Sequence, residues 1–347
     1  MSDPALAVTS PSGHGLRAAA RALFLAGCFV AGGLGTAHFV GSGLPFPPIP
    51  DLSARFNYFA ARKDEFDTIF IGSSRIRYQI RPQQFDAETA QLGAPTHSFN
   101  LGYSGMWPPE SDYFLRRILA LHPRQLRWVV IELMDYRFGE AERQPMTMRT
   151  TYWHDLAHTC MAWRLLVESP LPFGEKLPFY FIHARLFLQR LTHLGRGAEW
   201  LGDRYFPTKK KTDMSWVKRA GFDPEEKGEW SASARAEYAE KIQTFERLLP
   251  TGRMRPGLAA AVRDLAAEVR AAGAEPIFLI TPTVRPEENL AAGVPPNLTV
   301  WAFDLPQQYP RLYLPELHFD PGHLNEAGAT EFTSLLAVRL AELTGKR

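Results

Sequence analysis

The chain has 347 residues, which is enough for one large α/β domain or for two small ones. Its 39 Lys and Arg against 37 Asp and Glu give a formal net charge of +2, which offers no reason to propose a nucleic-acid partner or an unusually anionic substrate. The two cysteines, Cys28 and Cys160, exclude a disulfide framework and leave the cellular compartment open.

The amino-terminal segment predicts a membrane anchor. Residues 1–15 are small and polar and are typical of a disordered tail, here on the cytoplasmic side. Arg17 and Arg21 precede Ala22–Val40, an uncharged stretch close to the roughly 20 residues that a membrane helix needs. Arginines before this stretch and a folded domain after it predict that the domain lies outside the cytoplasm. We therefore assign residues 16–44 to a transmembrane helix.

Two alternatives to an uncleaved anchor stay open. A cleaved signal peptide would have a long apolar core, and no clear small-x-small cleavage site follows it. Leu25–Cys28 resembles a bacterial lipoprotein cleavage site, but the apolar stretch before it is short and the sequence after it stays hydrophobic. We favour the anchor, followed by a linker over residues 45–63 whose proline-rich start, Pro45–Pro50, is stiff and extended.

Five apolar, β-branched runs predict buried strands: Thr68–Ile71, Ser98–Leu101, Trp128–Leu133, Pro276–Thr281 and Leu298–Phe303. Helical patterns alternate with them or close the chain: Glu110–Leu121, Arg255–Ala272 and Asn325–Leu343, with Asn325 as a cap. This alternation predicts an α/β fold, a three-layer sandwich with a central five-stranded parallel sheet, over residues 64–347. A ligand site is expected at the carboxyl ends of the strands.

A segment at about 139–254 interrupts this rhythm. It is rich in aromatic and basic residues, including Lys209–Lys211, and Ser231–Leu249 is predicted to be helical, with Ser231 or Ser233 as its cap. We interpret the segment as a helical insertion after the third strand. Two hypotheses have equal weight: a lid or a surface that docks on a membrane or a membrane partner, and an ordinary helical subdomain with its own small core.

A serine turn follows the first predicted strand. Thr68–Ile71 runs into Gly72-Ser73-Ser74, so the strand presents a hydroxyl group at its carboxyl end. A serine hydroxyl attacks effectively only when a base removes its proton, and we predict Ser74 as the nucleophile. A dinucleotide-binding turn would need G-x-G-x-x-G and a phosphate loop would need Gly-Lys-Ser/Thr, and neither follows. Alone, the turn is a weak signal, because small residues are common in turns.

A second motif stands just before the last predicted helix. In Asp320-Pro-Gly-His323, a three-residue gap across a Pro-Gly turn lets an imidazole and a carboxylate face one way. We predict His323 as general base and Asp320 as the carboxylate that orients it. The alternatives are a turn with a helix cap, or two metal ligands, although no further ligands stand at suitable spacing. His318 nearby is interpreted as a surface loop histidine. The serine turn and Asp-x-x-His together are far more specific than either alone.

These motifs resemble the SGNH (GDSL-type) hydrolase superfamily, from about residue 64 to residue 345. Gly72-Ser73-Ser74 matches the first block with serine in place of aspartate, a variant similar to membrane-anchored SGNH-like proteins of cell-envelope acylation. The second block, whose glycine N–H serves the oxyanion hole, matches Asn100–Gly105. The resemblance implies an oxyanion hole formed by the N–H groups of Ser74 and Gly105, with Gly102 as the substitute for Gly105. The last block is Asp320–His323.

The third block differs from the family pattern. The family has Gly-x-Asn-Asp after the third strand, and its asparagine donates to the oxyanion, whereas this chain has Glu132–Arg137 (ELMDYR). An aspartate carboxylate would repel a developing oxyanion, and losing one donor costs roughly 3–4 kcal/mol of transition-state stabilisation. Tyr136 or Arg137 could substitute, or the two backbone N–H groups suffice. The difference favours a slow, dedicated acyltransferase over a fast general esterase.

Three side chains are candidates for substrate contact: Arg75, Trp107 and Tyr136. Arg75 and Arg77 could bind an anionic polysaccharide or a phosphate, although we slightly favour solvated positions on a helix face. Trp107 could stack on a sugar ring, and a packing tryptophan is equally consistent with its surroundings in the sequence.

The resemblance implies a single-pass protein of the bacterial inner membrane whose catalytic domain faces the periplasm. It implies transfer or removal of O-acyl groups on a cell-envelope polysaccharide, with no cofactor and no metal. Its partners would be an acylated polysaccharide or small acyl donor, the membrane, and a membrane-bound O-acyltransferase that supplies the acyl group. The alternatives are a stand-alone periplasmic esterase and a catalytically weak accessory or carbohydrate-binding member of the fold.

Overall fold

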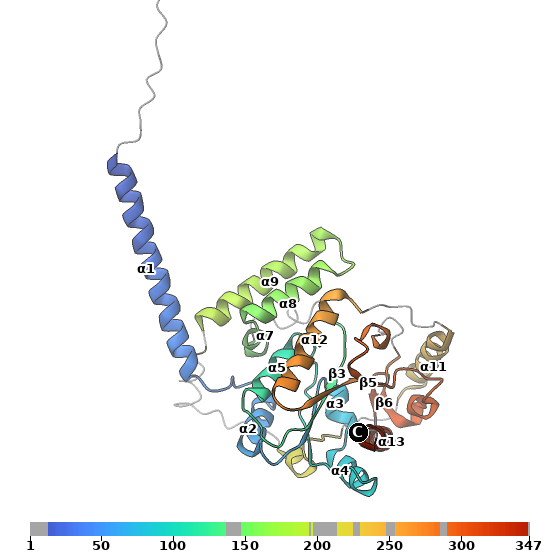
Figure 1. Ribbon diagram of the computed structural model, residues 1–347. Helices are drawn as coiled ribbons and strands as arrows, with labels where there is room; N and C mark the ends of the chain where they lie inside the picture. Colours follow the sequence, from blue (N-terminus) through green and yellow to red (C-terminus); the bar gives the residue numbers. More distant parts are fainter. Residues whose placement is uncertain are drawn as a thin grey trace, which may run out of the picture. The chain divides into compact units, whose positions relative to one another are not determined.

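The computed structural model describes residues 13–136, 147–193, 196, 214–224, 230–247, 254–284 and 290–345 (Figure 1). The chain forms two compact units. The first comprises Met1–Pro45 and Leu188–Thr208, and the second comprises Phe46–Phe187 and Lys209–Arg347. The second unit holds the sheet and all the residues of the candidate site.

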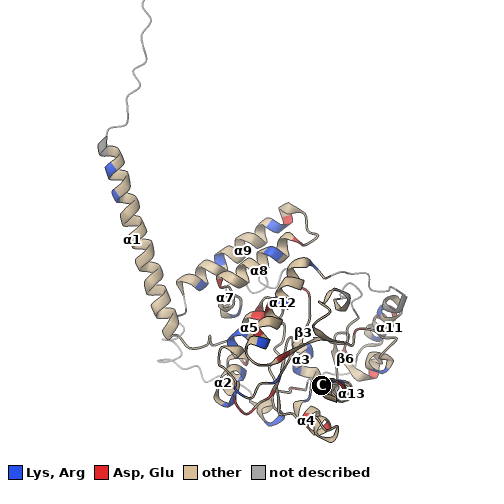
Figure 2. Ribbon diagram, viewed as in Figure 1, with Lys and Arg blue, Asp and Glu red and all other residues tan. Residues whose placement is uncertain are grey.

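The first unit is built around helix α1, Gly13–Gly43. Its stretch Gly15–Gly43 is long and apolar enough to cross a membrane, and its most apolar window is entirely unburied. Figure 2 shows basic residues near the start of this helix and none along the remainder. In the sequence these residues are Arg17 and Arg21. The predicted apolar span is therefore a single helix. A signal sequence near the amino terminus can also be long and apolar enough to meet this criterion, so these features do not distinguish an anchor from a signal.

A five-stranded parallel sheet lies at the centre of the second unit, with the strand order β2-β1-β3-β4-β5. The strands are β1 Thr68–Ile71, β2 Ser98–Asn100, β3 Trp128–Glu132, β4 Glu275–Ile280 and β5 Thr299–Ala302. The sequence prediction of five parallel strands is confirmed, with bounds that differ by no more than one residue at each end. The strand order reverses between β1 and β3, and this is where ligands bind in doubly wound sheets.

Alternate strand residues enter two separate hydrophobic clusters, one on each face of the sheet. Ile69 and Val129 belong to one cluster, and Phe70 and Val130 belong to the other. Helices α2, α5, α8 and α12 contribute to the first cluster, and α3, α4 and α13 contribute to the second. Because successive side chains of a strand point to opposite faces, a strand that is covered on both sides must be apolar throughout.

The helices are α2 Leu52–Arg62, α3 Ser74–Gln79, α4 Pro82–Gln91, α5 Glu110–Leu119, α7 Met148–Tyr152, α8 Leu156–Val167, α9 Phe173–Thr192, α11 Ala232–Arg247, α12 Pro256–Ala271 and α13 Glu326–Gly345. Short 3-10 helices are η1 Ser215–Arg219, η3 Ala291–Gly293, η4 Pro310–Tyr313 and η5 Pro315–Leu317. The predicted caps are present: Asn325 Oδ1 accepts the Gly328 N–H at 3.0 Å, and Ser231 Oγ accepts the Ala234 N–H at 3.1 Å.

The predicted insertion is partly described, and several of its described elements contribute to the core around the sheet. Tyr152 of α7, Leu165 of α8 and Trp216 of η1 join the same hydrophobic cluster as the strands. Helix α11 is held elsewhere, because the Tyr238 hydroxyl lies 3.1 Å from His318 Nε2 and donates to the Tyr313 carbonyl at 3.2 Å. Lys209–Lys211 lie outside the described residues.

Candidate active site

The serine turn connects strand β1 to helix α3. Ser73 caps this helix, because its Oγ accepts the N–H of Arg75 at 3.2 Å. Ser74 is the first residue of the helix. A Cβ at Gly72 would lie 2.5 Å from both Cβ and Oε2 of Glu132, so only glycine allows β1 to end against this side chain. The turn therefore fixes the backbone of Ser74 at the carboxyl end of the sheet.

The second motif forms a hairpin. Strands β6 His318–Asp320 and β7 His323–Leu324 are antiparallel, and Asp320 pairs directly with His323 across the Pro321-Gly322 turn. Directly paired residues project to the same face of a two-stranded sheet. The hairpin thus brings the carboxylate beside the imidazole, as the three-residue spacing predicts.

The two motifs meet, although Ser74 and His323 are 249 positions apart in the sequence. Ser74 Oγ lies 2.7 Å from His323 Nε2. His323 Nδ1 lies 2.9 Å from Asp320 Oδ1 and 3.0 Å from Asp320 Oδ2. With the proton on Nδ1, the ring donates to Asp320 and its Nε2 accepts from the serine hydroxyl. All three residues predicted as catalytic thus form one hydrogen-bonded chain.

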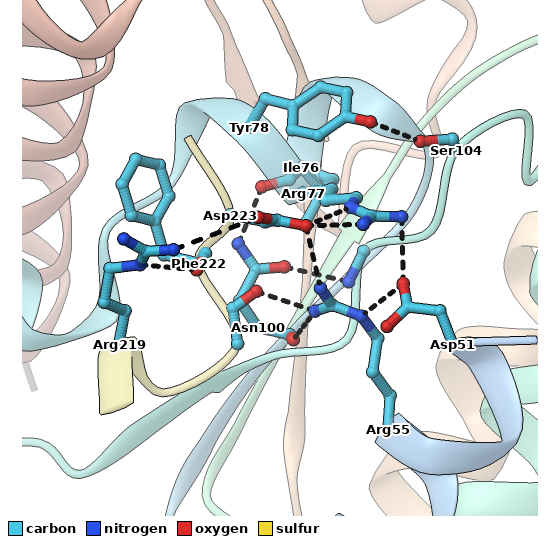
Figure 3. Close-up of polar contacts among 12 residues, drawn as sticks. Asp51, Arg55, Ile76, Arg77, Tyr78, Asn100, Ser104, Arg219, Phe222 and Asp223 are labelled. Carbon is cyan, nitrogen blue, oxygen red and sulfur yellow. Dashed lines mark hydrogen bonds and ion pairs between the residues drawn. The ribbon is translucent and has the colours of Figure 1, made fainter. Parts of the chain in front are cut away.

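Helix α3, which carries Ser74, is fixed from below by the side chain of Asn100 at the end of β2 (Figure 3). The Asn100 amide donates to the Ile76 carbonyl at 2.7 Å and to the Ile80 carbonyl at 2.9 Å. Its Oδ1 accepts the N–H of Gly102 at 2.8 Å. One buried amide therefore satisfies backbone groups of both the helix and the loop that follows β2.

An ion network beside Asn100 ties helix α2 and the segment after η1 to the nucleophile helix (Figure 3). The fully buried Arg55 donates to the Gly221 carbonyl at 2.7 Å and to Asp51 at 3.2 Å. Arg77 of α3 donates to Asp223 at 3.1 Å through Nε and lies 2.9 Å from Asp51 through Nη1. Two arginines thus share two carboxylates, which keeps the buried charges compensated.

Glu132, the last residue of β3, holds the nucleophile turn from the neighbouring strand. Its Oε2 accepts the N–H of Ser73 at 2.6 Å. Its Oε1 lies 3.0 Å from Arg75 Nε and accepts the hydroxyl of Thr281 at 3.2 Å. Glu132 is only 2% exposed, so these contacts replace the water that a carboxylate otherwise requires.

A cavity of about 680 Å³ opens beside the serine. Ser74 and His323 line it together with Arg75, Trp107 and Thr283, and helix α11 contributes one wall through Glu237, Glu240, Lys241 and Thr244. Lys241 Nζ lies 2.6 Å from Glu237 Oε1. The cavity is large enough for an acyl group and at least one sugar ring, and its wall offers both charges and hydroxyls.

The three predicted oxyanion donors differ in whether their backbone N–H groups are already hydrogen-bonded. Within the described residues, the backbone N–H groups of Ser74 and Gly105 have no acceptor. Gly105 has a φ of +67°, in the left-handed region, and its loop contacts the nucleophile turn because Tyr103 N–H donates to the Gly72 carbonyl at 2.9 Å. Gly105 is not among the residues that line the cavity. Gly102, predicted as the substitute for Gly105, is not free to donate to an oxyanion, because its N–H already donates to Asn100 Oδ1.

Arg75 and Arg77 do not occupy a solvated helix face. Arg75 is 7% exposed and pairs with Glu132, and Arg77 pairs with Asp51 and Asp223. Sequence periodicity missed this burial, because α3 lies between the sheet, α13 and the segment after η1, which leaves its basic side chains little contact with water. Arg75 lines the cavity, as a substrate-contacting residue would.

The other candidate residues differ in whether they line the cavity. Trp107 lines the cavity. Tyr136 is buried in the core, its hydroxyl lies 2.8 Å from His183 Nε2, and it does not line the cavity. His318, interpreted as a surface histidine, is buried, with Nε2 2.8 Å from the Leu312 carbonyl oxygen. Arg137 lies outside the described residues.

Sequence reasoning did not assign Glu132 a structural function, and it did not predict the wall formed by α11. Glu132 is the last residue of β3 and the last but one of the predicted strand Trp128–Leu133, and an acidic residue near the end of an apolar run was the available signal. Within the described ranges no group of three or more His, Cys, Asp or Glu residues is placed to hold a metal ion.

Comparison of the chain with protein-family models, with curated proteins and with solved structures finds no match. The chemistry of this site is therefore inferred from its own residues and distances.

Proposed function

We propose that the chain is a serine-dependent acyl-transferring or ester-cleaving enzyme of the SGNH type. The observation that carries the proposal is the continuous contact Ser74–His323–Asp320, with both links between 2.7 and 3.0 Å. These are the distances at which an imidazole can take a proton from a hydroxyl group while a carboxylate orients the ring. A purely structural turn has no need to align a solvent-accessible serine with such a pair.

The proposed reaction follows from these positions. Neutral His323 accepts the proton of Ser74 Oγ as the oxygen forms a bond to an ester carbonyl carbon, and the electron pair of the C=O bond moves to its oxygen. Asp320 stabilises the imidazolium that results. Collapse of the intermediate expels the alcohol, which takes the proton from His323, and leaves an acyl-serine. A sugar hydroxyl or a water molecule then completes the exchange by the reverse sequence.

The substrate class is proposed to be the O-acyl groups of a cell-envelope polysaccharide. Support comes from the cavity, where Trp107 offers an aromatic surface for a sugar ring and the side chains of α11 offer hydrogen-bonding groups. The motif resemblance to membrane-anchored acylation proteins points the same way. An acyl donor can be a small ester or a group delivered by a membrane-bound O-acyltransferase.

The proposed location is the outer side of the bacterial inner membrane. Support comes from the apolar helix α1 and from the two arginines before its apolar stretch. A domain held at this surface would meet both a membrane-embedded acyl donor and an extracytoplasmic polymer.

Covalent labelling tests the nucleophile directly. A fluorophosphonate probe is expected to label the wild-type protein at Ser74 and to leave Ser74→Ala unlabelled. The matched control is Ser73→Ala, which removes the adjacent hydroxyl and the helix cap, costs about 1 kcal/mol of stability and retains labelling. Absence of labelling in the folded wild-type protein would remove the catalytic proposal and favour an accessory role.

The acetyl content of the surface polysaccharide distinguishes a transferase from an esterase. In cells that carry Ser74→Ala, loss of acetyl groups from the surface polysaccharide indicates a transferase, and a gain indicates an esterase. An unchanged acetyl content, together with labelling of the wild-type serine, would contradict the proposed substrate.

A further inference from the structure

Arg75 lies one residue after the nucleophile and is held by residues from the end of β3. Its Nε lies 3.0 Å from Glu132 Oε1, and its Nη2 lies 2.9 Å from the sulfur of Met134. The third nitrogen, Nη1, has no acceptor among the described residues, and it is accessible to solvent. Arg75 lines the cavity together with Ser74 and His323, so the residue that carries these unused N–H groups is part of the same site.

Glu132 makes this arrangement rigid. One carboxylate oxygen holds the Ser73 N–H and the other pairs with Arg75, so the nucleophile turn and the guanidinium are fixed by the same side chain. The ion pair also allows a cation to remain in a site where it is only 7% exposed. A donor that is fixed before the reaction costs no reorganisation when charge develops.

Among the described residues of the segment after β3, no side chain is placed to donate to that charge. The segment after β3 offers Asp135, whose carboxylate pairs with Arg255 and accepts the N–H of Tyr136 at 2.7 Å. Tyr136 lies in the core and contacts His183. Lys241, the other basic side chain of the cavity wall, is neutralised by Glu237 on its own helix. Among the described residues that line the cavity, Arg75 is therefore the cation that is held in a fixed position and still has N–H groups without an acceptor.

We propose that Arg75 is a catalytic residue that stabilises the oxyanion, and that Glu132 is the residue that positions it. The inference rests on the proposed function. As Ser74 Oγ bonds to the carbonyl carbon and its proton passes to His323, the carbonyl oxygen gains the electron pair of the broken π bond. The Arg75 guanidinium donates a hydrogen bond to that oxygen beside the backbone N–H of Ser74. In this way Glu132, at the end of β3, contributes to the oxyanion hole indirectly, because it holds Arg75 of helix α3 in place.

The test uses the double variant R75A/E132Q, because it leaves no buried carboxylate without a partner. Hydrolysis of p-nitrophenyl acetate and the rate of fluorophosphonate labelling are measured for the wild type, the variant and R81A. Arg81 is a surface arginine that pairs with Glu326 and does not line the cavity, so R81A serves as a matched control. We expect kcat and the labelling rate of the double variant to fall roughly 100-fold or more, with KM nearly unchanged.

Low, non-denaturing concentrations of guanidinium chloride supply the missing group from solution. A catalytic guanidinium predicts partial recovery of kcat in R75A/E132Q and none in the wild type or R81A. R75K, which keeps the positive charge but lacks the planar fork, is expected to have intermediate activity.

Three results would overturn the inference. A double variant that is labelled at the wild-type rate shows that Arg75 donates nothing to the reaction. A slow, folded variant that guanidinium does not rescue, or one in which only KM rises, assigns Arg75 to structure or to ground-state binding. A wild-type protein that is never labelled at Ser74 removes the proposed function itself, and this inference with it.

Discussion

At the scale of single residues, Gly72 determines how the site is built. Because it has no Cβ, the end of β1 approaches the Glu132 side chain closely enough for Glu132 to accept the N–H of Ser73. The same carboxylate then holds Arg75. The absence of a side chain at Gly72 therefore lets Glu132, from the neighbouring strand, hold Ser73 and Arg75, the residues on either side of Ser74.

Asp320→Asn is predicted to disable catalysis without unfolding the protein. Asparagine has nearly the same shape, but its amide nitrogen can donate to His323 and so stabilise the wrong ring tautomer. We expect kcat for p-nitrophenyl acetate to fall on the order of 10⁴-fold, with a thermal midpoint close to that of the wild type. Asp64→Asn, which alters a surface carboxylate paired with Arg124, is the control. Near wild-type turnover in Asp320→Asn would exclude the orienting role of Asp320.

The sequence predicted the three residues of the hydrogen-bonded chain because each stands at a local pattern, a strand end or a Pro-Gly turn. Glu132 escaped prediction because its partners, Ser73, Arg75 and Thr281, follow the ends of β1 and β4, and adjacency of strands is not encoded in any single segment. The burial of Tyr136 could not be predicted from the sequence for the same reason. Tyr136 follows the end of β3, but its side chain turns into the core toward His183.

At the scale of elements, the nucleophile helix depends on parts of the chain that are remote from it. The α2 helix and the segment after η1 provide Arg55, Asp51 and Asp223, which surround Arg77 of α3 (Figure 3). Gly221 fits against Asn100 so closely that a Cβ would lie 2.1 Å from the Asn100 carbonyl oxygen. The segment after η1, within the predicted insertion, is thus part of the support of the site.

Arg55→Met is predicted to destabilise the second unit by about 3–5 kcal/mol, because it removes a fully buried cation and leaves the half-buried Asp51 and Asp223 with less compensation. Arg62→Met on the same helix is the control, since Arg62 is exposed and stacks on Tyr58, and we expect a change of less than about 1 kcal/mol. Urea denaturation measures both. Equal stability of the two variants would mean that the network contributes no more than a surface arginine does.

Helices α7 to α9 contain a buried chain of histidines that makes stability depend on pH. His154 Nε2 lies 2.8 Å from His183 Nδ1, and His183 Nε2 lies 2.8 Å from the Tyr136 hydroxyl. Burial lowers the pKa of His183 from 6.5 to about 4. The pKa of His154 is also lowered, by burial and by the neighbouring His183. The pKa of His158 moves upward, because hydrogen bonds to Asp112 and Asp155 outweigh its burial.

The sign of the His183 effect follows from proton binding. Between pH 6.5 and about pH 4 the unfolded chain carries a proton on this residue and the folded chain does not, so folding loses stability as the pH falls. At about pH 5 the loss amounts to about 2 kcal/mol. His183→Gln is expected to show a smaller decrease of the thermal midpoint between about pH 7 and about pH 5. An identical decrease in both proteins would contradict a buried, neutral His183.

The sequence predicted the strands well and left two hypotheses open for the insertion. Strands buried on both faces are continuous apolar runs, which the sequence displays directly. Helices α7 and α8 and the 3-10 helix η1 join the central core through a few aromatic and aliphatic residues, such as Trp216, whose partners lie more than a hundred residues away. Composition alone could not distinguish that arrangement from a separate subdomain.

At the scale of the whole molecule, the apolar helix and the sheet belong to two distinct compact units. Helix α1 has the length of a membrane span, whereas the core of the second unit begins with Ile49 and Leu52. Helix α1 is joined to the second unit in sequence through Gly43–Pro45, and the first unit also takes in Leu188–Thr208.

A variant that starts at Pro45 is predicted to move from the membrane fraction to the soluble fraction and to keep its fluorophosphonate labelling. The full-length protein is expected to remain in the membrane fraction at its full mass, as an uncleaved anchor requires. Recovery of a shorter, soluble product from the full-length gene would instead identify a cleaved signal peptide. Loss of labelling in a folded truncated variant would contradict the independence of the two units.

The hydroxyl of Ser74 and the ring of His323 come from opposite ends of the domain, and the hairpin that carries the ring lies directly before the last helix. In the proposed mechanism, Ser74 has no base beside it until the carboxyl-terminal hairpin docks against helix α3, so the last part of the chain to be synthesised completes the site.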